Sequence, residues 1–357
     1  FIYSDTLCEI ASVFTTNKMT AAPIRHFRLK NDFKTNFVLI NAKNANAMTG
    51  KSGIEDINEI LEHCDSQAVN PVMSSTGVIG VRLPKQKIIG GMKLFNLKHT
   101  NPANAAKAIM TTDSFSKEIA YTVELEDGNS FNIGAMAKGA GMINPAMATM
   151  LCFITTDANV SKVEMQEILD SVTKVTFNAA SVDGDTSTND TVMLLSNASS
   201  GAYNKDAFKE ALYEIMLFLA REMVRDGEGA TKLVTYKITG AKDNTEAEKV
   251  AKALSDSLLV KTALYGEDPN WGRIASTVGA AGVQADEQTL SISFDDLCVY
   301  NKGELLFDST MEEKASKVMQ KDTFTIACDL GIADGIFTSF GCDLGYEYVK
   351  INADYRT

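Results

Sequence analysis

One threonine stands at the end of a glycine-rich segment, in a setting that suits nucleophilic chemistry. Lys138 and a run of glycines and alanines lead into an apolar stretch that contains Ala148 and Thr149. A threonine hydroxyl is a weak nucleophile, and an adjacent N-terminal amine can activate it. Cleavage between Ala148 and Thr149 would leave such an amine, whose pKa is about 7.7–8.0. The segment therefore predicts a self-cleaving N-terminal nucleophile, against the commoner role of threonine as an ordinary strand residue.

Two further stretches carry polar groups and glycines close together. Residues 74–80 read SSTGVIG, which predicts a structural turn before a strand. The functional interpretation is that Gly77 allows a backbone N–H to approach a ligand closely. Residues 181–191 form the most polar stretch in the chain and predict a tight loop packed near an active site. Their aspartate spacing only weakly resembles a calcium loop, since the closing glutamate is missing.

Composition excludes several classes of function. The formal net charge of −12 argues against a nucleic-acid-binding role, because no basic stripe is available to neutralise phosphates. No apolar run reaches the roughly 18–20 residues of a membrane span. Six cysteines without a CxxC pair and three histidines without an HExxH pattern predict free thiols and no metal site. A GxSxG elbow is also absent, and a cytoplasmic protein is expected.

Periodicity predicts a mixed α/β fold in which sheets are layered with helices. Hairpins are expected about residues 127–128 and 301–303, and both apolar alternation and turn residues support them. The expected strands are residues 36–41, 151–154, 233–238, 324–329 and 345–352, and the expected helices are 53–63, 102–110, 161–169, 208–224, 245–258 and 314–319. The natural division falls at Thr149. The chain opens at Phe1 without a methionine, and we expect a segment before it to be missing from the sequence.

Several long motifs together resemble one known family. They are residues 75–80 (STGVIG), 138–158 (KGAGMINPAMATMLCFITTDA), 183–190 (DGDTSTND), 225–230 (RDGEGA) and 268–273 (DPNWGR). Their order and content are similar to the glutamate N-acetyltransferase/ornithine acetyltransferase family of arginine biosynthesis, from the VFTTN segment at 13–17 to the end of the chain. The chain departs from that pattern at Lys43 and Met48, where many members have small residues and cysteine.

The resemblance implies a set of site residues and an N-terminal-nucleophile-like acyltransferase architecture. Thr149 would be the nucleophile and Ala148–Thr149 the self-cleavage bond, while Thr76 and Gly77 would form the oxyanion hole. The positions that would contact the substrate are Thr112, Lys138, Thr149, Glu228, Asn352 and Thr357. Residues 1–148 would become an alpha chain and residues 149–357 a beta chain, interleaved in one catalytic unit. Two alpha and two beta chains would associate.

The same resemblance implies the reaction. The acetyl group of N-acetylornithine would pass to Thr149 and then to glutamate, releasing ornithine and N-acetylglutamate in a ping-pong order without a metal or redox cofactor. The sequence does not decide whether acetyl-CoA is a second donor. The alternative is a self-processed N-terminal-threonine amidohydrolase or aminopeptidase, in which water takes the acyl group. A third hypothesis is a structural protein in which residues 138–149 form only a packed glycine turn.

Overall fold

The computed structural model describes residues 1–144 and 150–354 of the 357-residue chain. The chain divides into two compact units. Among the described residues, the first unit contains Phe1–Asn178 and Asp185–Ala220, and the second contains Ala179–Gly184 and residues 221–354. Each unit has its own sheet and its own core, so each is described by itself.

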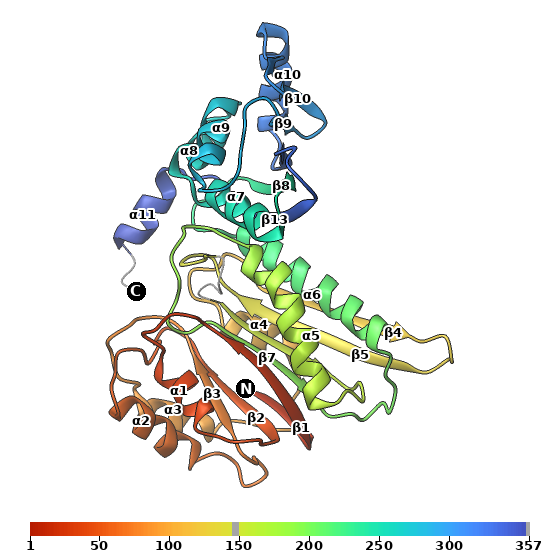
Figure 1. Ribbon diagram of the computed structural model, residues 1–357. Helices are drawn as coiled ribbons and strands as arrows, with labels where there is room; N and C mark the ends of the chain where they lie inside the picture. The colour runs from red at the N-terminus through yellow and green to blue at the C-terminus, as the bar shows by residue number, and fades with distance from the viewer. Residues whose placement is uncertain (145–149, 355–357) are drawn as a thin grey trace. The chain divides into compact units, whose positions relative to one another are not determined.

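A mixed sheet forms the centre of the first unit (Figure 1). In the described residues its order is β3-β2-β1-β7-β6-β5-β4. The pairs β2/β3 and β6/β7 are parallel, whereas β1/β2, β1/β7, β5/β6 and β4/β5 are antiparallel. The strands are β1 (Ile2–Phe14), β2 (Thr35–Asn41), β3 (Val72–Ser75), β4 (Lys117–Glu124), β5 (Ser130–Lys138), β6 (Leu151–Thr156) and β7 (Thr191–Ser196).

Strand β2 explains how this sheet is buried on both faces. Phe37 and Leu39 pack into one cluster of apolar side chains with Ile57 of α2, while Val38 packs into another with Leu151 and its neighbours. Because successive side chains point to opposite faces, a continuous apolar run suits a strand covered on both sides. The helices of this unit are α1 (Ala22–Arg28), α2 (Ser52–Leu61), α3 (Lys85–Met92), α4 (Pro102–Ala108), α5 (Lys162–Val175) and the start of α6 (Lys205–Arg225).

The second unit has a sheet of order β11-β10-β9-β12-β8-β13 in the described residues. Strands β8 and β12 are parallel, and the remaining pairs are antiparallel. Its core gathers apolar residues from β8, β12 and α7. The strands are β8 (Leu233–Ala241), β9 (Ser291–Phe294), β10 (Leu297–Asn301), β11 (Glu304–Leu305), β12 (Thr323–Asp329) and β13 (Gly335–Cys342), and the helices are α7 (Asn244–Asp256), α8 (Leu258–Tyr265), α9 (Trp271–Ala280), α10 (Ser309–Met319) and α11 (Tyr346–Asp354).

Most of the expected elements form, and the fold class is confirmed. The Asp127–Gly128 signal does mark the turn between β4 and β5, where Gly128 has φ +82°. One expected strand is wrong, because residues 345–352 lie largely in helix α11. Its aromatic and branched residues favour a strand only where a neighbouring strand can pair with them, and tertiary context overrides that preference. The helix expected over residues 245–258 begins one residue earlier, since the Asp243 side chain accepts the Glu246 N–H at the start of α7.

None of the helices in the described part of the chain is long and apolar enough to cross a membrane.

Candidate active site

The predicted oxyanion pair lies just beyond the end of β3. Thr76 is buried and donates its backbone N–H to the carbonyl of Asn41 at 3.0 Å. Gly77 has φ +125°, and a Cβ there would lie 2.2 Å from the backbone carbonyl carbon of Lys43. No residue with a side chain fits this backbone without moving the chain opposite, so the glycine is required by close packing. Within the described residues, no acceptor is found for the Gly77 N–H.

The polar loop before β7 holds this turn in place. The Nδ2 of Asn189 donates to the carbonyls of Ala45 and Ser75 at 2.7 and 2.8 Å. Asn189 is buried, so both hydrogen bonds are shielded from water. The loop expected near an active site therefore lies directly beside the residues that precede Thr76.

The next residue of the same loop contacts the chain that follows the proposed nucleophile. The Oδ1 of Asp190 accepts the N–H of Met150 at 3.0 Å, and the carbonyl of Met150 accepts the N–H of Thr191 at 3.1 Å. Burial raises the pKa of Asp190 well above its ordinary value, although the Met150 N–H and the charge of Lys138 partly oppose the shift. Asn189 and Asp190 thus link the predicted oxyanion pair to the residue after Thr149.

Lys138 is the last residue of β5 and pairs across the sheet with Leu151, the first residue of β6. Its side chain is only 2% exposed, and Nζ lies 3.9 Å from Oδ2 of Asp113. Burial alone would raise the pKa of Asp113, but the charges of Lys138 and Lys117 outweigh it and hold the pKa below its ordinary value. Thr112 is the neighbour of Asp113 in the chain, so two predicted substrate-contacting positions, Thr112 and Lys138, lie beside one buried carboxylate.

Two predicted substrate-contacting residues lie together in the second unit. The Nδ2 of Asn352 on α11 donates to Oε2 of Glu228 at 2.8 Å and to the carbonyl of Tyr348 at 3.0 Å. A Cβ on Gly229 would lie 2.6 Å from the backbone nitrogen of Tyr348, so this glycine lets the loop that carries Glu228 approach α11 closely. In this pair the Glu228 carboxylate accepts one hydrogen bond from the side-chain amide of Asn352.

Three predicted site residues, Ala148, Thr149 and Thr357, lie outside the described residues. The self-cleavage bond and the division into chains at residue 149 therefore stay predictions. The groups at Thr76 and Lys138 belong to the first unit, and the pair of Glu228 and Asn352 belongs to the second.

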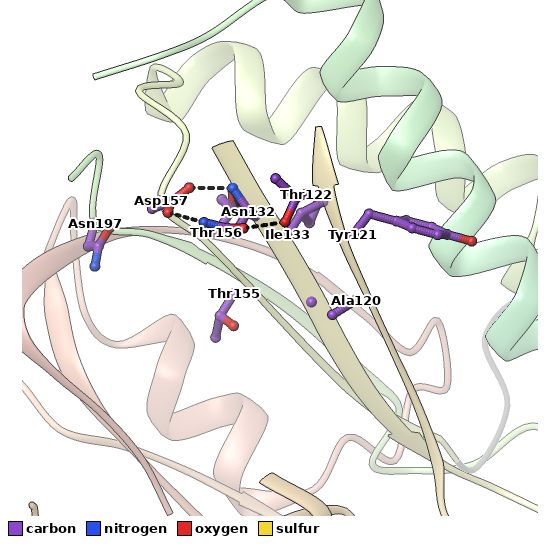
Figure 2. Close-up of a pocket in the computed structure, with 10 residues that line it drawn as sticks. Ala120, Tyr121, Thr122, Asn132, Ile133, Thr155, Thr156, Asp157 and Asn197 are labelled. Carbon is purple, nitrogen blue, oxygen red and sulfur yellow. Dashed lines mark hydrogen bonds between the residues drawn. The ribbon is translucent and has the colours of Figure 1, made fainter. Parts of the chain in front are cut away.

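An open pocket of the first unit lies elsewhere, over strands β4, β5 and β6 (Figure 2). Asp157 accepts hydrogen bonds from both the backbone and the side-chain amide of Asn132, and Asn132 accepts one from Thr122. Neither Thr76, Gly77, Thr112 nor Lys138 lines it. We therefore place the candidate site at the ends of β3, β5 and β7 rather than in this pocket.

A family model described as the ArgJ family matches residues 1–357. The chain belongs to the ArgJ family. This confirms the resemblance drawn from the motifs, since the match extends over the whole chain.

Curated ArgJ-family proteins resemble the chain over its full length. The arginine biosynthesis bifunctional protein ArgJ of Wolinella succinogenes is 62% identical over 361 residues, which cover 100% of this chain and 91% of the relative. Glutamate N-acetyltransferase of Methanopyrus kandleri is 41% identical over 374 residues, covering 100% and 95%. The crystal structure of arginine biosynthesis bifunctional protein ArgJ from Bacillus halodurans matches with 40% identity and a TM-score of 0.52, covering 56% of this chain and 97% of the solved chain.

Three residues of this ArgJ-family site were not singled out from the sequence. Asp113, Asn189 and Asp190 make the contacts that join its parts, yet each looks in sequence like an ordinary polar loop residue. For Asn189 and Asp190 the signals were the polarity of residues 181–191 and the motif at 183–190, and neither distinguished these two residues from their neighbours. The motif at residues 268–273 forms the start of a helix, because Asn270 caps α9. Its Trp271 stacks on Tyr300.

Proposed function

We propose that the chain is a glutamate N-acetyltransferase of arginine biosynthesis that takes its acetyl group from N-acetylornithine. The observation that carries the proposal is the match of the entire chain to the ArgJ family. One relative named above is a bifunctional protein of arginine biosynthesis, which suggests the pathway, and another is a glutamate N-acetyltransferase, which suggests the reaction. The buried, hydrogen-bonded setting of Thr76, Gly77 and Lys138 supports the proposal.

The first half of the reaction forms an acetyl-enzyme. In the cut chain the hydroxyl of Thr149 attacks the acetyl carbonyl of N-acetylornithine, and the α-amine of Thr149 takes the hydroxyl proton. The negative charge that develops on the carbonyl oxygen is met by the Thr76 hydroxyl and the Gly77 N–H, and each such donor is worth about 3–4 kcal/mol. Collapse of this intermediate breaks the amide bond, and ornithine leaves with the proton from the Thr149 ammonium.

The second half reverses these steps with another amine. The α-amine of glutamate attacks the acetyl ester on Thr149, the ester bond breaks and the Thr149 hydroxyl regains its proton. The product is N-acetylglutamate. Lys138 is proposed to hold a substrate carboxylate, and Glu228 with Asn352 the cationic end of ornithine, since each charge suits its partner. Thr112 and Thr357 complete the proposed contacts.

Intact mass of the purified protein under denaturing conditions tests the nucleophile directly. Two pieces are expected, divided between Ala148 and Thr149. A single uncut chain in an active preparation would refute the N-terminal amine mechanism. Initial rates at several fixed glutamate concentrations should give parallel double-reciprocal lines, because a covalent intermediate separates the two substrates. Intersecting lines would contradict the ping-pong order.

The self-processed amidohydrolase or aminopeptidase remains the competing reaction. It predicts steady release of free acetate from N-acetylornithine without glutamate, whereas the transferase predicts one ornithine per site and an acetyl group that stays on Thr149. The family match favours the transferase.

Further features of the proposal come from the resemblance. They are a cytoplasmic location, association of two alpha with two beta chains, and catalysis without a metal or redox cofactor. Whether acetyl-CoA also donates is tested by adding it with glutamate in place of N-acetylornithine and measuring free CoA.

A further inference from the structure

The carboxylate of Asp113 joins three segments of the first unit. Its Oδ1 accepts hydrogen bonds from Nζ of Lys117 at 2.8 Å and from the backbone N–H of Gly139 at 2.7 Å. Its Oδ2 accepts the backbone N–H of Thr111 at 3.0 Å and faces the Lys138 ammonium. The side chains of Asp113 and Lys117 are fully buried. One carboxylate therefore fixes the loop before β4, the first residue of β4 and the end of β5.

Both substrate-contacting positions proposed in this region depend on that carboxylate. Thr112 lies between Thr111, whose N–H Asp113 binds, and Asp113 itself, so the backbone is held on each side of it. Lys138 is held at its ammonium by Asp113, and the next residue, Gly139, is held at its N–H. The resemblance gives no role to Asp113, yet Asp113 fixes the positions of Thr112 and Lys138, to which the resemblance does give roles.

We propose that Asp113 is a positioning residue for acetyl transfer, which fixes the backbone around Thr112 and orients the Lys138 ammonium toward the substrate. The inference rests on the proposed function and deepens it. The competing explanation is that Asp113 pairs with Lys117 only to fasten the start of β4. The two explanations differ because only the first makes the charge state of Lys138 depend on Asp113.

The charged groups around Lys138 in the described residues determine the sign of the effect. They include the Asp113 carboxylate and the Lys117 ammonium on its far side, together with Asp190, whose pKa is raised by burial. Without the Asp113 carboxylate the Lys138 ammonium loses a buried opposite charge, so its pKa falls. Without the Lys117 ammonium, Asp113 pairs with Lys138 alone, and a second positive charge is removed from the neighbourhood of Lys138. The pKa of Lys138 therefore rises. Asp190 is the same in every variant.

The experiment compares the pH profiles of kcat/KM in full-length, self-processed protein. The variants are Asp113→Asn, which keeps the size of the side chain and removes its charge, and Lys117→Met, which keeps the aliphatic stem. The matched control is Asp56→Asn, because Asp56 is also a buried aspartate between two cations, Arg82 at 2.6 Å and Lys85 at 3.4 Å. Acetyl transfer from N-acetylornithine to glutamate is measured, and intact mass establishes cleavage in each sample.

For Asp113→Asn we expect the alkaline limb of the profile to move down by about 1–2 pH units, with a loss of about 10–100-fold in kcat/KM above that limb. For Lys117→Met the limb should move up, and for Asp56→Asn it should stay in place.

An unmoved limb in Asp113→Asn, or a downward shift in Lys117→Met, would overturn the positioning role. If Asp113→Asn does not fold, the direction of the Lys117→Met shift decides alone. A wild-type protein that transfers no acetyl group would instead refute the proposed function, and the role of Asp113 would fall with it.

Discussion

Replacing Gly77 by alanine should damage both stability and turnover, whereas the same change at Gly80 should damage neither strongly. Both glycines have positive φ, +125° at Gly77 and +82° at Gly80. A Cβ on Gly77 would lie 2.2 Å from the carbonyl carbon and 2.5 Å from the Cα of Lys43. A Cβ on Gly80 would meet no atom within 4 Å. Comparing the two alanine variants therefore separates the cost of a steric collision with the backbone from the cost of a positive φ.

The magnitudes follow from these two terms. An alanine with positive φ costs about 1–2 kcal/mol in free energy of unfolding, and this is the whole cost expected at Gly80. Collision in a packed region adds about 1–3 kcal/mol, and the backbone atoms of Lys43 cannot rotate away as a flexible side chain would. The expected loss for Gly77→Ala is thus about 2–5 kcal/mol. Relief of the collision must also turn the Gly77 N–H, and loss of one oxyanion donor lowers kcat by about 10²–10³-fold.

Urea unfolding and steady-state kinetics on both variants provide the assay, with intact mass to confine the comparison to cut protein. Gly77→Ala should lose stability and kcat together, while Gly80→Ala should keep kcat close to that of the wild type. Equal kcat in the two variants would refute the assignment of the Gly77 N–H to the oxyanion hole. Equal unfolding midpoints would refute the packing argument.

Three further predictions concern other parts of the site. Glu228→Gln should raise the KM for N-acetylornithine about 10–150-fold, because a charge-assisted contact worth about 1.5–3 kcal/mol is lost; an unchanged KM would exclude Glu228 from binding the cationic end. Asn189→Ala should lower the free energy of unfolding by about 2–6 kcal/mol, since the buried carbonyls of Ala45 and Ser75 lose their donor, and urea unfolding would show a smaller loss if water replaces it. Burial raises the pKa of Asp190, so the folded state retains a proton that the unfolded chain releases, and this contribution to stability falls as pH rises above about 4. Asp190→Asn should remove that slope, which reaches about 1.4 kcal/mol per pH unit, and unfolding curves from pH 5 to 8 that keep the wild-type slope would contradict it.

The elements that were predicted well are those whose signal is local. The turn at Asp127–Gly128 depends on one glycine with positive φ, and the helix about residues 208–224 depends on apolar spacing within its own length. Helix α11 was missed because its signal is not local. None of its residues is buried, so no apolar face marks it as a helix, and its aromatic and branched residues resemble those of a strand.

The same distinction between local and non-local signals applies to the site residues. Thr76, Gly77 and Lys138 lie in motifs that can be recognised in the sequence itself. Asn189 also lies in such a motif, but its role could not be predicted, because its two acceptors lie 144 and 114 positions earlier in the chain. Asp113 meets Gly139 across 26 positions, and this contact exists only after β4 and β5 have paired. Contacts of this kind are set by the topology of the sheet rather than by any local pattern.

The strand order of the first unit predicts how the two pieces would stay together after the proposed cut between Ala148 and Thr149. Strands β6 and β7 follow Thr149, yet they lie between β1 and β5, which precede it. Six residue pairs join β7 to β1 and six join β6 to β5. The two strands of the later piece therefore pair on both sides with strands of the earlier piece. The pieces can separate only if these strand pairs break. Dilution should leave the cut enzyme intact and active, while pieces expressed apart should be unable to form the sheet of the first unit until they meet.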